Sequence, residues 1–200
     1  MKKIVSILLV VSMMISMSTT AFAAARESFL EKSLDTYQIQ SVSNYEIGLQ
    51  TNGAIRSMVV FDRNLGTVDV VSIDDETGII TINDDTLIPV EIWPQAGISS
   101  YAEDNWTDPQ TTVTSLALGA YTAGAIVGFL SLKYGVPSDT AAYIAGLVLG
   151  AGGFLYVKSV TQFNYVDYSP KVGYRLTESL HLTDEADGKS LFVRTMTGTR

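Results

Sequence analysis

The sequence contains no cysteine and only one histidine, His181. The lack of cysteine excludes a disulfide framework, thiolate metal sites, a cysteine nucleophile and a lipid-modified cysteine. A single imidazole cannot form a multi-histidine zinc site and is a poor basis for a histidine-based relay. Glu178 lies three residues before His181, on the opposite face of a predicted strand, so the two are not an obvious catalytic pair. The phosphate-binding motif G-x-x-x-x-G-K-[ST] and the nucleophile motif G-x-S-x-G are also absent. We therefore expect a protein that is not an enzyme, with no catalytic, cofactor-binding or metal-binding residues.

Basic residues are scarce as well. The 200 residues include 13 basic and 21 acidic side chains, which gives a net charge of −8. Because nucleic acid binding needs patches of Lys and Arg, the composition argues against a nucleic acid partner. The imbalance is local, since residues 24–110 carry 15 acidic and 4 basic side chains and residues 111–200 carry 6 and 7. The chain therefore joins an acidic region to a nearly neutral one.

The first 23 residues have the three parts of a secretory signal peptide. Two lysines precede an uncharged and mostly apolar run, Ile4–Met17, which is too short for a stable membrane span. The small residues Ala21 and Ala23 then occupy the positions that signal peptidase recognises. We expect cleavage between Ala23 and Ala24 and a secreted chain of 177 residues, whose net charge is −10 once the two lysines are lost.

Residues 24–93 predict an acidic, β-rich region. Its first segment, Glu27–Gln40, spaces its apolar residues as a short amphipathic helix does. From Ala54 onward, β-branched and apolar residues alternate with polar ones, which is typical of strands, and turn-forming residues separate these runs. The predicted strands are Ser57–Phe61, Thr67–Ser72, Gly78–Asn83 and Leu87–Trp93, the last confined by Pro89 to the edge of a sheet or the start of a strand.

The remaining β structure is predicted at the other end of the chain. Residues 94–110 have no hydrophobic period and contain proline and glycine, so they are expected to form a linker. Residues 159–200 return to a strand pattern and predict a C-terminal β-meander. Its predicted strands are Phe163–Tyr168, Val172–Leu182 and Ser190–Met196.

Residues 111–158 predict a hydrophobic helical hairpin. No charged residue occurs from Pro109 to Leu132 or from Thr140 to Val157, and a glycine and a proline between these runs would end the first helix. The predicted arms are Ser115–Leu132 and Ala141–Val157. Each would be about 26 Å long, slightly shorter than a hydrocarbon layer of about 30 Å.

Small residues recur at four-residue spacing in both arms. Because positions four apart share one helix face, each arm would present a smooth surface that another backbone could approach closely. Glycine costs about 1 kcal/mol relative to alanine inside a helix, so its repeated use calls for a packing reason. The first ladder is Ala120, Gly124 and Gly128, and the second is Ala142, Gly146 and Gly150.

The sequence thus predicts an α+β protein in which antiparallel β-meander regions flank a Gly/Ala-rich helical hairpin. The strongly apolar residues of each arm supply only about −2 to −4 kcal/mol toward membrane insertion, which is marginal. Three interpretations follow. The hairpin inserts into a bacterial membrane or oligomerises through its small-residue faces; it is the buried core of an extracellular or cell-envelope interaction module; or it is a permanent membrane anchor.

The layout also resembles that of a known protein family. A signal peptide, an acidic β-rich region, a Gly/Ala-rich hydrophobic stretch and a Tyr-rich strand tail are similar to the large, unmodified geobacillin-type bacteriocins of Gram-positive bacteria. The resemblance implies a secreted antibacterial protein that acts on the envelope of related cells, and it assigns no functional residue. The segments that carry it are Met1–Ala23, Val59–Arg63, Gly78–Ile82, Ala141–Gly153 and Phe163–Leu176.

Overall fold

A computed structural model describes residues 24, 27, 38–42, 44–94, 109–166, 169–183 and 189–199. The predicted signal peptide lies outside these residues, as do nearly all of the helix predicted over Glu27–Gln40 and most of the predicted linker. The chain divides into two compact units. The first unit comprises Met1–Thr86 and Thr122–Ala142, and the second comprises Leu87–Tyr121 and Tyr143–Arg200.

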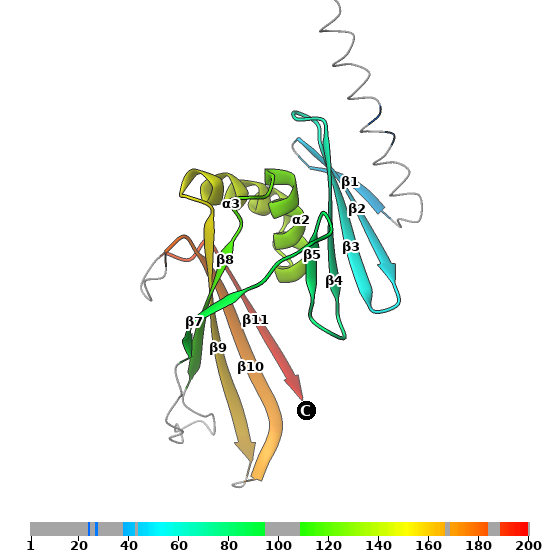
Figure 1. Ribbon diagram of the computed structural model, residues 1–200. Helices are drawn as coiled ribbons and strands as arrows, with labels where there is room; N and C mark the ends of the chain where they lie inside the picture. The colour runs from blue at the N-terminus through cyan, green and yellow to red at the C-terminus, as the bar shows by residue number, and fades with distance from the viewer. Residues whose placement is uncertain are drawn as a thin grey trace, which may run out of the picture. The chain divides into compact units, whose positions relative to one another are not determined.

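The first unit contains a six-stranded antiparallel sheet, here called sheet A, whose strands follow one another in chain order (Figure 1). Alternating β-branched residues form the strands, and glycines with positive φ, such as Gly53 at 60° and Gly78 at 71°, form the turns. The strands predicted over Ser57–Phe61 and Thr67–Ser72 are confirmed, whereas the one predicted over Gly78–Asn83 contracts to Ile80–Ile82, because Gly78 and Asn83 have positive φ. The strands are β1 (Gln38–Val42), β2 (Tyr45–Asn52), β3 (Ile55–Asp62), β4 (Thr67–Asp74), β5 (Ile80–Ile82) and β6 (Asp85–Thr86).

One helix, α2 (Ala123–Tyr134), packs on strands β3 and β4 of sheet A (Figure 1). Thr122 caps its start, because its hydroxyl accepts a hydrogen bond from the amide of Ala125 at 3.1 Å. Gly135 ends it with φ of 67°, and its amide donates to the carbonyl of Ser131. This bond from the left-handed glycine is the αL type of helix cap, and the amide of Val136 donates in addition to the carbonyl of Leu130.

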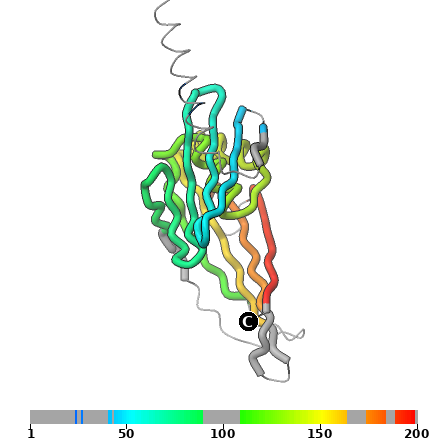
Figure 2. Tube along the Cα trace, turned by 90° about the vertical axis from the view of Figure 1, so that its right-hand side faces the viewer, coloured from blue at the N-terminus to red at the C-terminus, as the bar shows by residue number. Residues whose placement is uncertain are grey.

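The second unit contains a five-stranded antiparallel sheet, here called sheet B, whose long strands run side by side in Figure 2. Its order is β11-β10-β9-β8-β7, so β7 lies at one edge and starts directly after Pro89, as a proline requires. The C-terminal meander is confirmed. The strands are β7 (Val90–Pro94), β8 (Gln110–Ala117), β9 (Phe154–Val166), β10 (Ser169–His181) and β11 (Phe192–Thr199).

The predicted arms of the hairpin were too long. Residues 115–117 belong to β8 and residues 154–157 to β9, so the helices contract to α2, with 12 residues, and α3 (Ser138–Gly150), with 13. Absence of charge had indicated helix there, but those residues pair as antiparallel strands, with Ser115 opposite Tyr156 and Ala117 opposite Phe154. At about 1.5 Å per residue the helices are about 18 to 20 Å long. In the part of the chain that the structure describes, no helix has the length and apolar character needed to cross a membrane.

The two sheets and two helices of the described residues confirm the α+β class. Both helices lie in one excursion, residues 118–153, that connects the neighbouring strands β8 and β9 of sheet B, a pairing that the sequence had not predicted. The base of this excursion is closed by a hydrogen bond of 2.7 Å from the amide of Leu118 to the carbonyl of Gly153. The backbones of Gly119 and Gly153 are so close that a Cβ on Gly153 would lie 2.4 Å from the Cα of Gly119.

Candidate functional site: a helix seat on sheet A

The two glycines of the first ladder that lie within a helix face sheet A. A Cβ on Gly128 would lie 3.1 Å from a methyl group of Val60 and 3.1 Å from a methyl group of Val71, and both valines are fully buried. A Cβ on Gly124 would lie 2.7 Å from a carboxylate oxygen of Asp69. The packing reason that the glycine spacing called for is therefore a close approach of helix to sheet. We call the surface formed by Arg56, Val60, Asp69 and Val71 the helix seat.

At the N-terminal end of α2 the seat presents a buried carboxylate. Asp69 is 2 % exposed and accepts a hydrogen bond of 2.6 Å from the hydroxyl of Thr122 and one of 2.8 Å from the side-chain amide of Asn83. A buried charge needs such partners, and a negative charge is stabilised near a helix N-terminus. The hydroxyl of Thr122 therefore links β4 to α2, since it donates to Asp69 and also caps the helix.

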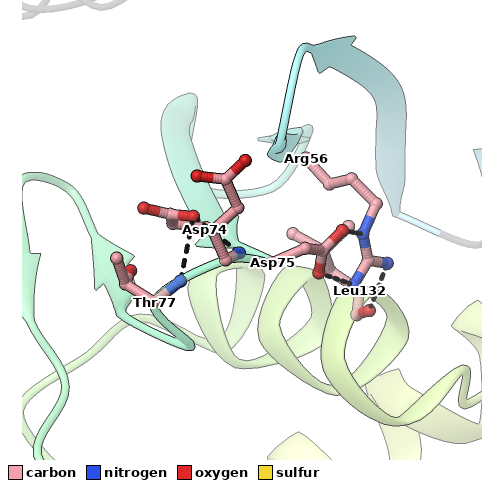
Figure 3. Close-up of polar contacts among 6 residues, drawn as sticks. Arg56, Asp74, Asp75, Thr77 and Leu132 are labelled. Carbon is pink, nitrogen blue, oxygen red and sulfur yellow. Dashed lines mark hydrogen bonds and ion pairs between the residues drawn. The ribbon is translucent and has the colours of Figure 1, made fainter.

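At the C-terminal end the seat presents a positive charge. The guanidinium of Arg56 donates to the carbonyl of Leu132 at 3.3 Å and holds Asp75 with two hydrogen bonds of 2.6 and 2.7 Å (Figure 3). The hydrogen bond between them raises the pKa of Arg56 and lowers that of Asp75. A cation is favourable near the last carbonyls of a helix, so the two ends of α2 meet complementary charges.

The rest of α2 is also covered. Nine of its twelve residues are buried, which leaves it no solvated face. Its largest fully buried side chain, Phe129, meets the ring of Tyr134 edge-on, with centroids 5.7 Å apart. In this structure the apolar residues of α2 are therefore packed within the protein.

The structure separates the other small residues from the seat. Ala120 lies in an exposed turn before α2 and so outside any helix, which shortens the first ladder to Gly124 and Gly128. In α3, Ala142 is half-buried, while a Cβ on Gly146 or Gly150 would meet nothing within 4 Å. The second ladder therefore has no partner among the described residues.

The exposed side of α3 is apolar. Tyr143 and Leu149 are 66 % and 38 % exposed, and they share this surface with the open Gly146 and Gly150. No charged side chain follows Asp139 in the helix. This surface is uncharged and has no groove of its own, in contrast to the seat.

Sequence reasoning missed three residues of the seat contact, although each left a signal. Asp69 falls in β4 on the face that also carries Val71 and Ile73, so it is an acidic residue at a buried position of an alternating strand. Thr122 directly precedes an apolar helical run, where a capping residue belongs. Arg56 left the weakest signal, since its partners, Asp75 and Leu132, are 19 and 76 residues away.

The titratable groups of sheet B do not form a comparable site. His181 is buried and its Nε2 lies 2.8 Å from the hydroxyl of Ser179, two residues earlier on β10. Glu178 projects to the other face, as predicted, and pairs with Arg194. Among the residues that the structure describes, no group of three or more His, Asp and Glu side chains is placed to hold a metal ion.

Comparisons with protein-family models, curated proteins and solved structures found no match to this chain. The function is therefore inferred from the geometry of the molecule. The helix seat combines three features that hold a helix in place: apolar contact, close backbone approach and complementary charges at both helix ends.

Proposed function

We propose that this chain is an exported, non-enzymatic interaction module of the cell envelope or the extracellular space, in which α2 is core structure. The observation that carries the proposal is the fit of Gly124 and Gly128 against Val60, Asp69 and Val71. Glycine at these two positions permits a close approach, since a Cβ would lie 3.1 Å from valine methyl groups at Gly128 and 2.7 Å from the Asp69 carboxylate at Gly124, and the approach is made to this protein's own sheet.

Energetics support the helix on the sheet over the helix in lipid. Removing α2 would uncover Val60 and Val71, each of which is stabilised by roughly 1.5–3 kcal/mol when fully buried. Asp69 would also lose the hydroxyl of Thr122, and a hydrogen bond to a charged group contributes about 1.5–3 kcal/mol. Together these losses exceed the insertion energy of about −2 to −4 kcal/mol expected for a longer arm than α2.

A reversible lock tests this role of α2. The Cβ of Val71 lies 3.7 Å from the Cβ position at Gly128, close to the mean of about 3.8 Å for disulfides. The double variant Val71→Cys, Gly128→Cys can therefore be oxidised, and the chain has no other cysteine to compete. We expect the oxidised and reduced forms of residues 24–200 to behave alike and neither to release dye from lipid vesicles. Dye release by the reduced form alone would show that α2 leaves the sheet to act on membranes.

A second function, a membrane-active protein of bacteriocin type, is favoured by the exposed apolar side of α3. In that case a bacterial membrane is the partner, and Tyr143 and Leu149 contact it first. The variant Tyr143→Glu, Leu149→Glu places two charges on this surface without touching the seat. Dye release by the parent and none by the variant would support this function, whereas equal release would remove α3 from it.

A further inference from the structure

The helix seat joins two parts of the sequence that are far apart along the chain. All four seat residues come from β3 and β4, whereas the helix that occupies the seat follows 35 residues that belong to the other unit. Since the chain contains no cysteine, the backbone that continues from Thr86 is the one covalent link between sheet A and everything downstream, α2 included. The contact between α2 and the helix seat is therefore held by non-covalent interactions alone.

The backbone link is short, and after the buried Leu87 it is exposed. Three residues outside any strand, Leu87-Ile88-Pro89, separate β6 from β7. The central one, Ile88, has 74 % of its surface exposed, and the proline restricts the backbone just before β7. Short connecting segments of this kind favour exchange of identical elements between two copies of a protein.

We infer that the helix seat also takes α2 from a second copy of this chain, which gives a dimer that exchanges the helix reciprocally. The inference rests on the proposed role of the seat as an interaction site. A second copy supplies the one helix known to match it, with Gly124 and Gly128 opposite the valines, Thr122 opposite Asp69 and the last carbonyls opposite Arg56. The exchanged dimer would contain every contact between α2 and the helix seat that the monomer contains. Exchange changes only which chain supplies the helix.

Mass action sets the concentration at which this happens. A short flexible link holds two sites at an effective concentration of about 1 mM, so the closed monomer prevails in dilute protein. At about 0.1 mM chain, roughly a tenth of the molecules should exchange when they fold together, since the ratio of the two concentrations sets the share. Chains folded at about 1 µM should be almost entirely monomeric by the same ratio.

Single-cysteine variants distinguish exchange from closure. Val71→Cys and Gly128→Cys are prepared as separate chains with different tags, unfolded together in urea, refolded at about 0.1 mM and oxidised. A disulfide between the two chains forms only where a helix from one chain lies on the sheet of the other. Half of the exchanged dimers pair two copies of the same variant, so roughly a twentieth of the chains should be linked if the effective concentration is about 1 mM. The matched control pairs Val71→Cys with Gly146→Cys, whose position on α3 is open, and should give at least tenfold less linked product.

Each result of this experiment supports or overturns the proposed exchange. Linked product above the control supports exchange, and it should be accompanied by a wild-type dimer in size-exclusion chromatography after refolding at about 0.1 mM but not at about 1 µM, as the effective concentration requires. No linked product above the control, while the double variant closes its internal disulfide, overturns exchange and leaves the proposed function standing. Failure of the double variant to close would overturn the seat itself and, with it, both proposals.

Discussion

Alanine substitutions at two glycines that look equivalent in the sequence should shift stability in opposite directions. Gly124 and Gly146 both lie in uncharged helical runs, four residues before another glycine. At Gly146 a new Cβ meets nothing within 4 Å, whereas at Gly124 it would lie 2.7 Å from the Asp69 carboxylate. The comparison therefore isolates the contact with sheet A from the general preference of helices for alanine.

The magnitudes separate the two variants. Gly146→Ala should stabilise its helix by about 1 kcal/mol, which is the difference in intrinsic helix propensity. Gly124→Ala gains at most the same amount, but forcing a group into a packed site costs about 1–3 kcal/mol. The Oδ2 atom of Asp69 must also withdraw from the hydroxyl of Thr122, and a hydrogen bond to a charged group contributes about 1.5–3 kcal/mol. We expect a net loss of about 1.5–5 kcal/mol at Gly124.

Hydrogen exchange in increasing urea measures both effects when it is read from amides of the first unit for Gly124→Ala and from amides of the second unit for Gly146→Ala. Intrinsic fluorescence would not, because both tryptophans, Trp93 and Trp106, lie in the part of the sequence assigned to the second unit. The control is Gly124→Ala in an Asp69→Ser background, where the shorter side chain makes room and the alanine should become nearly neutral. Equal stabilisation by Gly124→Ala and Gly146→Ala would refute the close approach of helix to sheet.

Four further predictions concern other contacts. Arg56→Gln should cost less than about 1 kcal/mol in urea titrations, because exposed ion pairs contribute little. Folding lowers the pKa of Asp75, so the stability that this carboxylate contributes is complete above the ordinary aspartate pKa and is lost as pH falls through the lower folded value. The Asp75→Asn variant should lack this loss of stability in an acid titration. Burial, with the negative charges of Asp62 and Asp69, raises the pKa of Tyr45, so stability should decline as pH rises above about 10, and less in Tyr45→Phe. Gly153→Ala should lower the melting temperature more than any of these, since φ is 82° and the new Cβ would lie 2.4 Å from the backbone of Gly119; a melting temperature near that of the parent would contradict this crossing.

Local patterns predicted most of the β structure. In β3 and β4 the apolar residues alternate and turn residues bound each run, so the strand assignments needed no knowledge of distant contacts. The same reasoning failed at Ser115–Ala117 and Phe154–Val157, where the absence of charge suited either a helix or a buried strand. Only the pairing of these two segments with each other, across more than 35 residues, makes them strands.

The helix seat shows where sequence reasoning reaches its limit. The spacing of Gly124 and Gly128 indicated a close contact with another backbone, but it left open whether the hairpin was inserted in lipid, formed an oligomer or was buried in a core. Gly146 and Gly150 carry the same spacing and meet nothing. Spacing within a helix defines a face, whereas the element that covers the face depends on long-range packing.

The closed base of the excursion has a consequence for how such a chain could be assembled or trimmed. Residues 118–153 leave β8 and return to β9 at one rung, between Ala117 and Phe154, so the 36 residues behave as a cassette inserted into a β-hairpin. A single genetic insertion at that turn would add both helices and keep the strand order of sheet B. Conversely, a two-residue Asn-Gly turn in place of residues 118–153 would join β8 to β9 as a plain hairpin. Sheet A would then lack α2, so that each sheet could be studied without the other.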